Sequence, residues 1–78
     1  MKSKPISKDH IKQLEIFGMF FRELRLGQGL TQEELCCNTN VHRRTIQRLE
    51  RGENVTILSV IEIAETLDID FLKEFIGN

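Results

Sequence analysis

The chain has 78 residues, of which 40% are hydrophobic and 29% charged, so we expect one small domain with a modest core. No apolar run approaches the ~18 residues of a membrane-spanning helix, and no secretory leader pattern follows the basic N-terminus, so we expect a cytoplasmic protein with no membrane partner. The formal net charge is −1, but four lysines lie within residues 1–12, four arginines within 42–51 and six acids within 53–78.

An N-terminal arm and a long helix are the first predicted elements. Residues 1–8 are small, polar and basic, so we expect a flexible basic arm that precedes a single domain over 9–78. Apolar residues recur every three or four positions over about 9–27, which predicts a helix. These residues are Ile11, Leu14, Phe17, Phe21 and Leu24. Gly27 or Gly29 is available as the left-handed residue that ends this helix.

A short second helix is predicted to begin after Thr31 and to end near Asn38. The sequence TQEE is a capping box, in which the Thr31 hydroxyl accepts from the Glu34 amide and the Glu34 carboxylate reaches back. The residues NTN that follow are typical of a turn. We expect Asn40 to be the left-handed residue of this turn, because Asn tolerates that backbone conformation.

Three more helices complete the predicted fold. One covers about 42–51 and stops at Gly52. Thr56 is expected to cap the next helix, and Asp70 a short last helix. The apolar stripe of the fourth helix comprises Ile57, Val60, Ile61, Ala64 and Leu67. No segment alternates as a strand would, so the predicted fold class is all-α, a compact bundle of five helices.

The helix over 42–51 is predicted to have a basic face. At 100° per residue, its polar side chains fall within an arc of about 140° that faces away from Ile46 and Leu49. These side chains are Arg43, Arg44, Gln47, Arg48 and Arg51. Most charged faces are merely solvated, but this face has no acid for i,i+4 pairing, and arginine suits phosphate and the guanine edge. The pattern therefore favours contact with nucleic acid.

The second helix, the turn and the third helix have the spacing of a helix-turn-helix. The stretch LRLGQGLTQEELCCNTNVHRRTIQRLERGENVT resembles the phage-repressor-like, or XRE-type, helix-turn-helix family, and the resemblance covers roughly residues 17–72. It implies a lambda-repressor-like DNA-binding domain that regulates transcription. It also implies a homodimer on a near-palindromic operator in double-stranded DNA, with the helix over 42–51 in the major groove.

The resemblance implies a role for each matching position. Gln32 matches a glutamine that contacts phosphate and often a base edge. Arg51 and Asn54 match the loop that contacts the DNA backbone. Arg25 and Glu50 match a structural pair that joins the first helix to the recognition helix. The base-reading and groove-lining positions are Arg43, Arg44, Gln47 and Arg48.

Four positions depart from the family pattern or leave alternatives open. Cys36 stands where the family usually has Ala, and Asn40 where it usually has Gly; both residues fit these needs. Thr39 replaces an aliphatic residue, which slightly weakens the local core. For His42, at the start of the recognition helix, three interpretations are open: a helix cap, a phosphate contact, or a solvated side chain.

A second candidate surface involves the first and last helices. Met19 and Phe20 are apolar where the family usually has exposed polar residues. Either the N-terminal arm or the fifth helix covers them, or they form a protein–protein surface. Phe71 and one neighbour are expected to close the core. The candidate dimer or partner surface comprises Met19, Phe20, Leu72, Phe75 and Ile76.

Other functional classes are less well supported by the sequence. One alternative is a protein-interaction module of the same fold. Another is an antitoxin or a restriction–modification controller that acts with a partner protein. No catalytic constellation is present, so we expect no enzyme and no cofactor. The short chain leaves no room for a ligand-sensing domain, so we expect no small-molecule ligand. The adjacent Cys36 and Cys37 lack the further ligands of a zinc site, and we expect both to be reduced.

Overall fold

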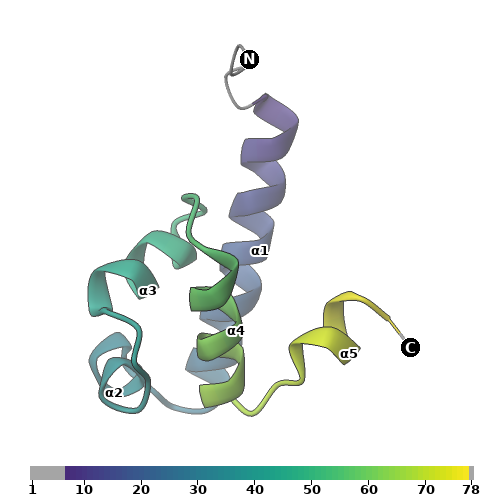
Figure 1. Cartoon of the computed structure of the whole chain (residues 1–78). Helices are drawn as coiled ribbons and strands as arrows, with labels where there is room; N and C mark the ends of the chain where they lie inside the picture. Colours follow the sequence, from purple (N-terminus) through teal and green to yellow (C-terminus); the bar gives the residue numbers. More distant parts are fainter. Residues whose placement is uncertain (1–6, 78) are drawn as a thin grey trace.

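The computed structural model describes residues 7–77, which form five helices and no strand (Figure 1), and the all-α prediction is confirmed. The helices are α1 (Lys8–Gly27), α2 (Gln32–Cys37), α3 (Arg43–Glu50), α4 (Ile57–Thr66) and α5 (Phe71–Phe75). Helix α1 begins at the last residue of the predicted arm, and residues 1–6 of that arm lie outside the described part. No helix within 7–77 has both the length and the apolar character needed to cross a membrane.

Polar side chains cap the helices where the sequence predicts them. Thr56 and Asp70 accept hydrogen bonds from the first turns of α4 and α5. The capping box of α2 is complete: Thr31 Oγ1 accepts from the Glu34 N–H at 3.0 Å, and Glu34 Oε1 accepts from the Thr31 N–H at 3.0 Å. Two hydrogen bonds with Thr31 lower the pKa of the Glu34 carboxyl: the bond with the Thr31 backbone has the larger effect, and the bond with its side chain the smaller one. The ionised carboxylate therefore suits the start of α2.

The two predictions of a left-handed residue have different outcomes. Gly29, with φ 72°, ends α1 as predicted. The prediction for Asn40 is wrong, because Asp68, with φ 62°, is the only non-glycine residue with positive φ within residues 7–77. Five residues separate α2 from α3, and they reverse the chain without a left-handed residue. Within this turn the Asn38 N–H donates to the Leu35 carbonyl oxygen at 3.0 Å, and the Val41 N–H donates to Thr39 Oγ1 at 3.4 Å.

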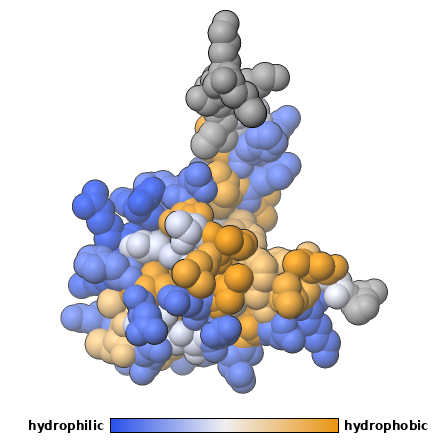
Figure 2. Space-filling model, in the orientation of Figure 1, coloured by the Kyte–Doolittle hydropathy of each residue, from blue (hydrophilic) through white to orange (hydrophobic). Residues whose placement is uncertain are grey.

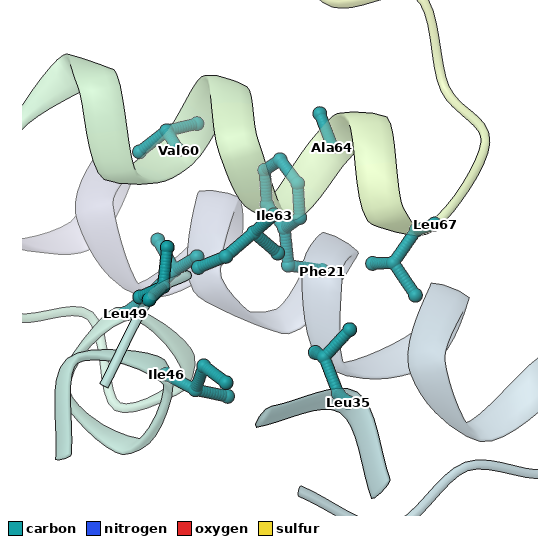
Figure 3. Packing of buried hydrophobic residues seen from close by; sticks show 9 residues of the cluster. Phe21, Leu35, Ile46, Leu49, Val60, Ile63, Ala64 and Leu67 are labelled. Carbon is teal, nitrogen blue, oxygen red and sulfur yellow. The ribbon is translucent and has the colours of Figure 1, made fainter. Parts of the chain in front are cut away.

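The core lies where α1, α2, α3 and α4 converge (Figure 3). Its buried members are Phe21, Leu35, Val41, Ile46, Leu49, Val60, Ile63, Ala64 and Leu67. Ile57, at the start of the predicted apolar stripe of α4, is 63% exposed, and Ile11, the first apolar residue of the pattern in α1, is 44% exposed. The first turns of α1 extend beyond the body of the protein (Figure 1). In α4 the buried stripe includes Ile63, which fits the same spacing of three and four.

Aromatic rings hold α5 against α1. The ring of Phe75 lies 5.2 Å from that of Phe17 and 5.4 Å from that of Phe20, both edge-on. Phe20 also contacts Phe21, at 5.5 Å, and Phe71 contacts Phe75, at 5.0 Å. Such edge-to-face pairs are favourable beyond the area they bury. Of the alternatives for Phe20, the structure favours cover by the fifth helix, through Phe75. Phe71 packs against the core as predicted, whereas Phe75 contacts the rings of α1 and remains 37% exposed.

Helices α1 and α3 approach each other closely at two glycines. A Cβ atom added to Gly18 would clash with the backbone oxygen of Leu49 and lie 3.1 Å from that of Glu50. At Gly52, which has φ 81°, a Cβ atom would lie 2.7 Å from the Cα atom of Glu15. Only glycine fits both positions. The C-terminal end of α3 can therefore lie directly on α1.

A buried ion pair joins the same two helices. Arg25 Nε and Nη2 donate to the two carboxylate oxygens of Glu50 at 2.7 and 2.9 Å, and the two side chains are only 7% and 5% exposed. Arg25 Nη1 also donates to the Leu30 carbonyl oxygen at 2.7 Å. The hydrogen bond to Glu50 raises the pKa of Arg25, although burial acts in the opposite direction. This bidentate pair fixes the rotation of α3 about its own axis.

Gly18→Ala is expected to destabilise the fold by about 1–3 kcal/mol, because the added methyl group forces α1 and α3 apart. Urea unfolding followed by circular dichroism measures the change. Gly27→Ala is the matched control, because a Cβ atom at that position would have nothing within 4 Å. Equal stability of the two variants would contradict the close approach of the helices.

Glu50→Gln is expected to lower the free energy of unfolding by about 3–5 kcal/mol, because it leaves the Arg25 charge buried without a counter-charge. The same urea titration measures the loss. Glu23→Gln, at an exposed acid of α1, serves as the control and should change stability by less than about 0.5 kcal/mol. If the two variants proved equally stable, the pair would not be what holds α3 to α1.

Candidate nucleic-acid interface

Helix α3 separates a buried apolar stripe from a basic surface. Ile46 and Leu49 are 1% and 3% exposed and pack in the core. The opposite side of α3 and the loop that follows carry the predicted binding residues, and this side of the molecule is strongly hydrophilic in Figure 2. Of these residues, Gln47 is half-buried, and the exposed ones are Arg43, Arg44, Arg48, Arg51 and Asn54. The structure therefore brings these predicted residues together.

His42 is the N-cap of α3. Its Nδ1 atom accepts a hydrogen bond from the Arg44 N–H at 3.1 Å. Of the three interpretations of His42, the structure therefore shows the helix cap. The imidazole remains exposed at the start of the basic surface. Its cap fixes where α3 begins and hence where the first arginines of the helix lie.

Arg43 and Arg44 begin α3 and form no ion pair within residues 7–77. Both side chains are exposed. Arg43 also borders a shallow hollow between the end of α1 and the start of α2, lined in part by Thr31 and Gln32. An arginine that has no internal acid offers its full set of N–H donors to an external acceptor.

Arg48 and Arg51 share one carboxylate, which belongs to Glu53. Arg48 Nε lies 3.4 Å from Glu53 Oε1, and Arg51 Nε lies 3.0 Å from Glu53 Oε2. Arg48 Nη2 also donates to the carbonyl oxygen of Asn54 at 3.0 Å. The expectation that this face has no acid for i,i+4 pairing is met, because Glu53 lies in the loop after α3, five residues after Arg48 and two after Arg51. Sequence reasoning missed Glu53 because its approach depends on how the loop turns back.

Gln32, at the first position of α2, is half-buried. Its Nε2 atom donates to Glu50 Oε1 at 3.1 Å, so α2 joins the buried pair of α1 and α3. The predicted phosphate contact of Gln32 is not tested by this geometry. The structural link to Glu50 was not predicted from the sequence, because it needs the relative placement of three helices.

The two cysteines lie in different surroundings, and both are free thiols. Cys36 is half-buried, and its Sγ atom contacts the Val41 carbonyl oxygen at 3.7 Å. Cys37 is exposed. Within the described range, 7–77, no group of three or more His, Cys, Asp or Glu side chains is placed to hold a metal ion.

Comparisons with known proteins agree with the geometry. A family model described as helix-turn-helix (HTH_3) matches residues 21–73. The chain is 32% identical over 60 residues to y4dJ of Sinorhizobium fredii, named as an uncharacterized HTH-type transcriptional regulator, and the match covers 76% of this chain and 78% of that protein. The crystal structure of the restriction-modification controller protein C.AhdI from Aeromonas hydrophila is also similar. Its TM-score is 0.71 at 37% identity, over 76% of this chain and 91% of that chain.

The matched residues include α2, the turn and α3, together with α4 and the start of α5. The resemblance inferred from the motif is therefore confirmed by an independent family match, and the fold by a solved structure. Residues 32–50 contain the two helices of the motif, with the basic surface on the second. The chain belongs to the XRE-type helix-turn-helix family and is a DNA-binding regulator of transcription.

Proposed function

We propose that the protein reads a specific operator by placing α3 in the major groove of double-stranded DNA. The observation that carries this proposal is the position of Arg43 and Arg44: both are exposed, neither is paired with an acid within residues 7–77, and both lie in the first turn of α3. In helix-turn-helix proteins the N-terminal residues of the recognition helix meet the base edges. Arginine makes bidentate bonds to O6 and N7 of guanine, so these two residues are the proposed readers of sequence.

The other predicted residues receive supporting roles in this proposal. Gln47 and Arg48 contact bases or nearby phosphates, farther along the groove. His42 caps α3 and remains exposed beside the proposed path of the DNA backbone. The remaining contacts to phosphate, which set register but carry no sequence information, come from Gln32, Arg51 and Asn54.

The proposal includes a homodimer on a near-palindromic operator. One module buries on the order of 600–1,000 Å² on DNA, and two modules whose recognition helices lie about 34 Å apart double that contact. Apolar surface gathers over α4 and α5 (Figure 2). Its large exposed side chains there are Ile57, Leu58, Leu72, Phe75 and Ile76. A second copy that covers this face would remove these side chains from water. The alternative dimer contact is on α1, at Met19, which is 58% exposed.

The proposed activity is binding alone, without catalysis, cofactor or small-molecule ligand. It takes place where the protein has access to the genome, and the proposed location is the cytoplasm. A narrower candidate is control of a restriction–modification system, which the likeness to C.AhdI favours. Adjacent genes for a methyltransferase and an endonuclease would support this candidate, and their absence would count against it.

Arg43→Ala or Arg44→Ala is expected to weaken binding to a duplex selected from random DNA by about 1–3 kcal/mol and to relax sequence preference. Fluorescence anisotropy with the selected duplex and a scrambled duplex measures both effects. Arg51→Ala is the contrasting variant: it should weaken both duplexes alike and flatten the slope of log K against log salt by about one. Equal binding of the two duplexes by the wild-type protein would contradict sequence-specific readout.

Leu72→Glu with Ile76→Glu is expected to convert the dimer into a monomer, because it places two charges in the proposed apolar contact. Analytical ultracentrifugation with and without a palindromic duplex measures the stoichiometry. Met19→Glu, at a side chain of similar exposure on α1, is the comparison. Dissociation by Met19→Glu but not by the double variant would move the interface from α4 and α5 to α1.

A further inference from the structure

The arginines of the basic surface fall into two pairs, one without and one with an ion pair to an acid of the same chain. Arg43 and Arg44, in the first turn of α3, form no ion pair within the described residues. At the other end, Arg48 and Arg51 are held by the one carboxylate of Glu53, through contacts of 3.4 and 3.0 Å. One acid therefore offsets part of the positive charge of this surface, and it acts only on the half that lies farther from the predicted base-reading turn.

The fold places Glu53 there by backbone contacts. The Glu53 N–H donates to the Arg48 carbonyl oxygen at 2.9 Å, and the Gly52 N–H to that of Leu49 at 3.0 Å. Gly52 turns the chain with φ 81° and lies tightly against Glu15 of α1, where no larger residue fits. Because the turn at Gly52 packs against α1, it places the Glu53 carboxylate beside the exposed face of α3.

Arg48 is held by a second acceptor as well. Its Nη2 atom donates to the Asn54 carbonyl oxygen at 3.0 Å, while its Nε atom faces Glu53. Two acceptors from the same loop restrict the orientation of its guanidinium group. A restricted arginine suits one arrangement of phosphates and bases, whereas a mobile one follows the phosphates of any duplex.

We propose that Glu53 is a specificity-determining residue, which limits the binding of DNA of arbitrary sequence through Arg48 and Arg51. Non-specific binding is supplied almost entirely by phosphate contacts, so it is the part of the affinity that a nearby carboxylate reduces most. At physiological salt, charges interact over about 8 Å, so a carboxylate on these arginines also repels the phosphates they would bind. The operator retains the contacts of Arg43 and Arg44, which Glu53 does not touch. This inference rests on the proposed role of the α3 arginines.

The pairs of Glu53 contribute little to the fold itself, which allows a clean test. The side chains of Arg48, Glu53 and Arg51 are 44%, 45% and 65% exposed. Exposed ion pairs of this kind add little to folding stability. Glu53→Gln should therefore fold like the wild type, as circular dichroism and the urea midpoint will show, and Glu53→Ala gives a second variant without the charge.

The experiment compares wild type and Glu53→Gln on the selected duplex and on a scrambled duplex of the same composition. At 0.15 M salt we expect the affinity of Glu53→Gln for the scrambled duplex to rise about 3- to 10-fold, and its salt slope to steepen by about one. The ratio of selected to scrambled affinity should fall at least about 3-fold, because the operator affinity rises less. The salt slope is a readout that a merely structural role of Glu53 would not change.

Glu74→Gln on α5 is the matched control, because it removes the same charge from an exposed site on the opposite side of α4 from α3 (Figure 1). It should leave the ratio of affinities unchanged. The proposal for Glu53 would be overturned if Glu53→Gln and Glu74→Gln had the same ratio of selected to scrambled affinity. It would also be overturned if Glu53→Gln bound both duplexes more weakly than the wild type. If the wild type itself showed no preference for the selected duplex, the proposed readout function would fail first, so the two failures are distinguishable.

Discussion

The contact between α1 and the C-terminal end of α3 determines how the basic surface is presented. Helix α3 has eight residues and only two buried side chains, too few for it to be stable alone. Gly18 allows its backbone to lie on α1, and the buried pair of Arg25 and Glu50 fixes its rotation. Gln32 joins the same carboxylate, so α2 is oriented by it too. Both helices of the motif therefore depend on one junction of three side chains, Arg25, Glu50 and Gln32.

Two acids at the end of α3 illustrate how burial decides the role of a charge. Glu50 is 5% exposed and satisfies a buried arginine, so its removal affects folding. Glu53, three residues later, is 45% exposed and pairs with surface arginines, so its effect falls on what those arginines bind. The net charge of −1 is therefore compatible with DNA binding, because within residues 7–77 Glu53 is the only acid that forms ion pairs with the arginines of the basic surface.

Much of this fold follows from local sequence signals, and the errors have identifiable causes. The caps at Thr31, Thr56 and Asp70 were predictable because each bond spans only three residues. The position of the left-handed residue was not predictable, because both Asn and Asp tolerate that conformation. The geometry of the loops selects Asp68 and not Asn40. The exposed Ile57 and the approach of Glu53 to Arg48 likewise depend on tertiary packing, which spacing alone does not encode. The basic surface itself was predictable, because most of its residues lie on one helix and the rest follow directly after it.

The central claim is that arginines in the first turn of α3 read guanine in the major groove. The most direct test is to measure binding to the selected duplex after guanines in each half-site are replaced, one at a time, by 7-deazaguanine, which removes the N7 acceptor and keeps base pairing. If the claim is correct, at least one replacement in each half-site weakens binding by about 1–3 kcal/mol in the wild type and has little further effect in Arg43→Ala or Arg44→Ala. Unchanged affinity for every substituted duplex would contradict it.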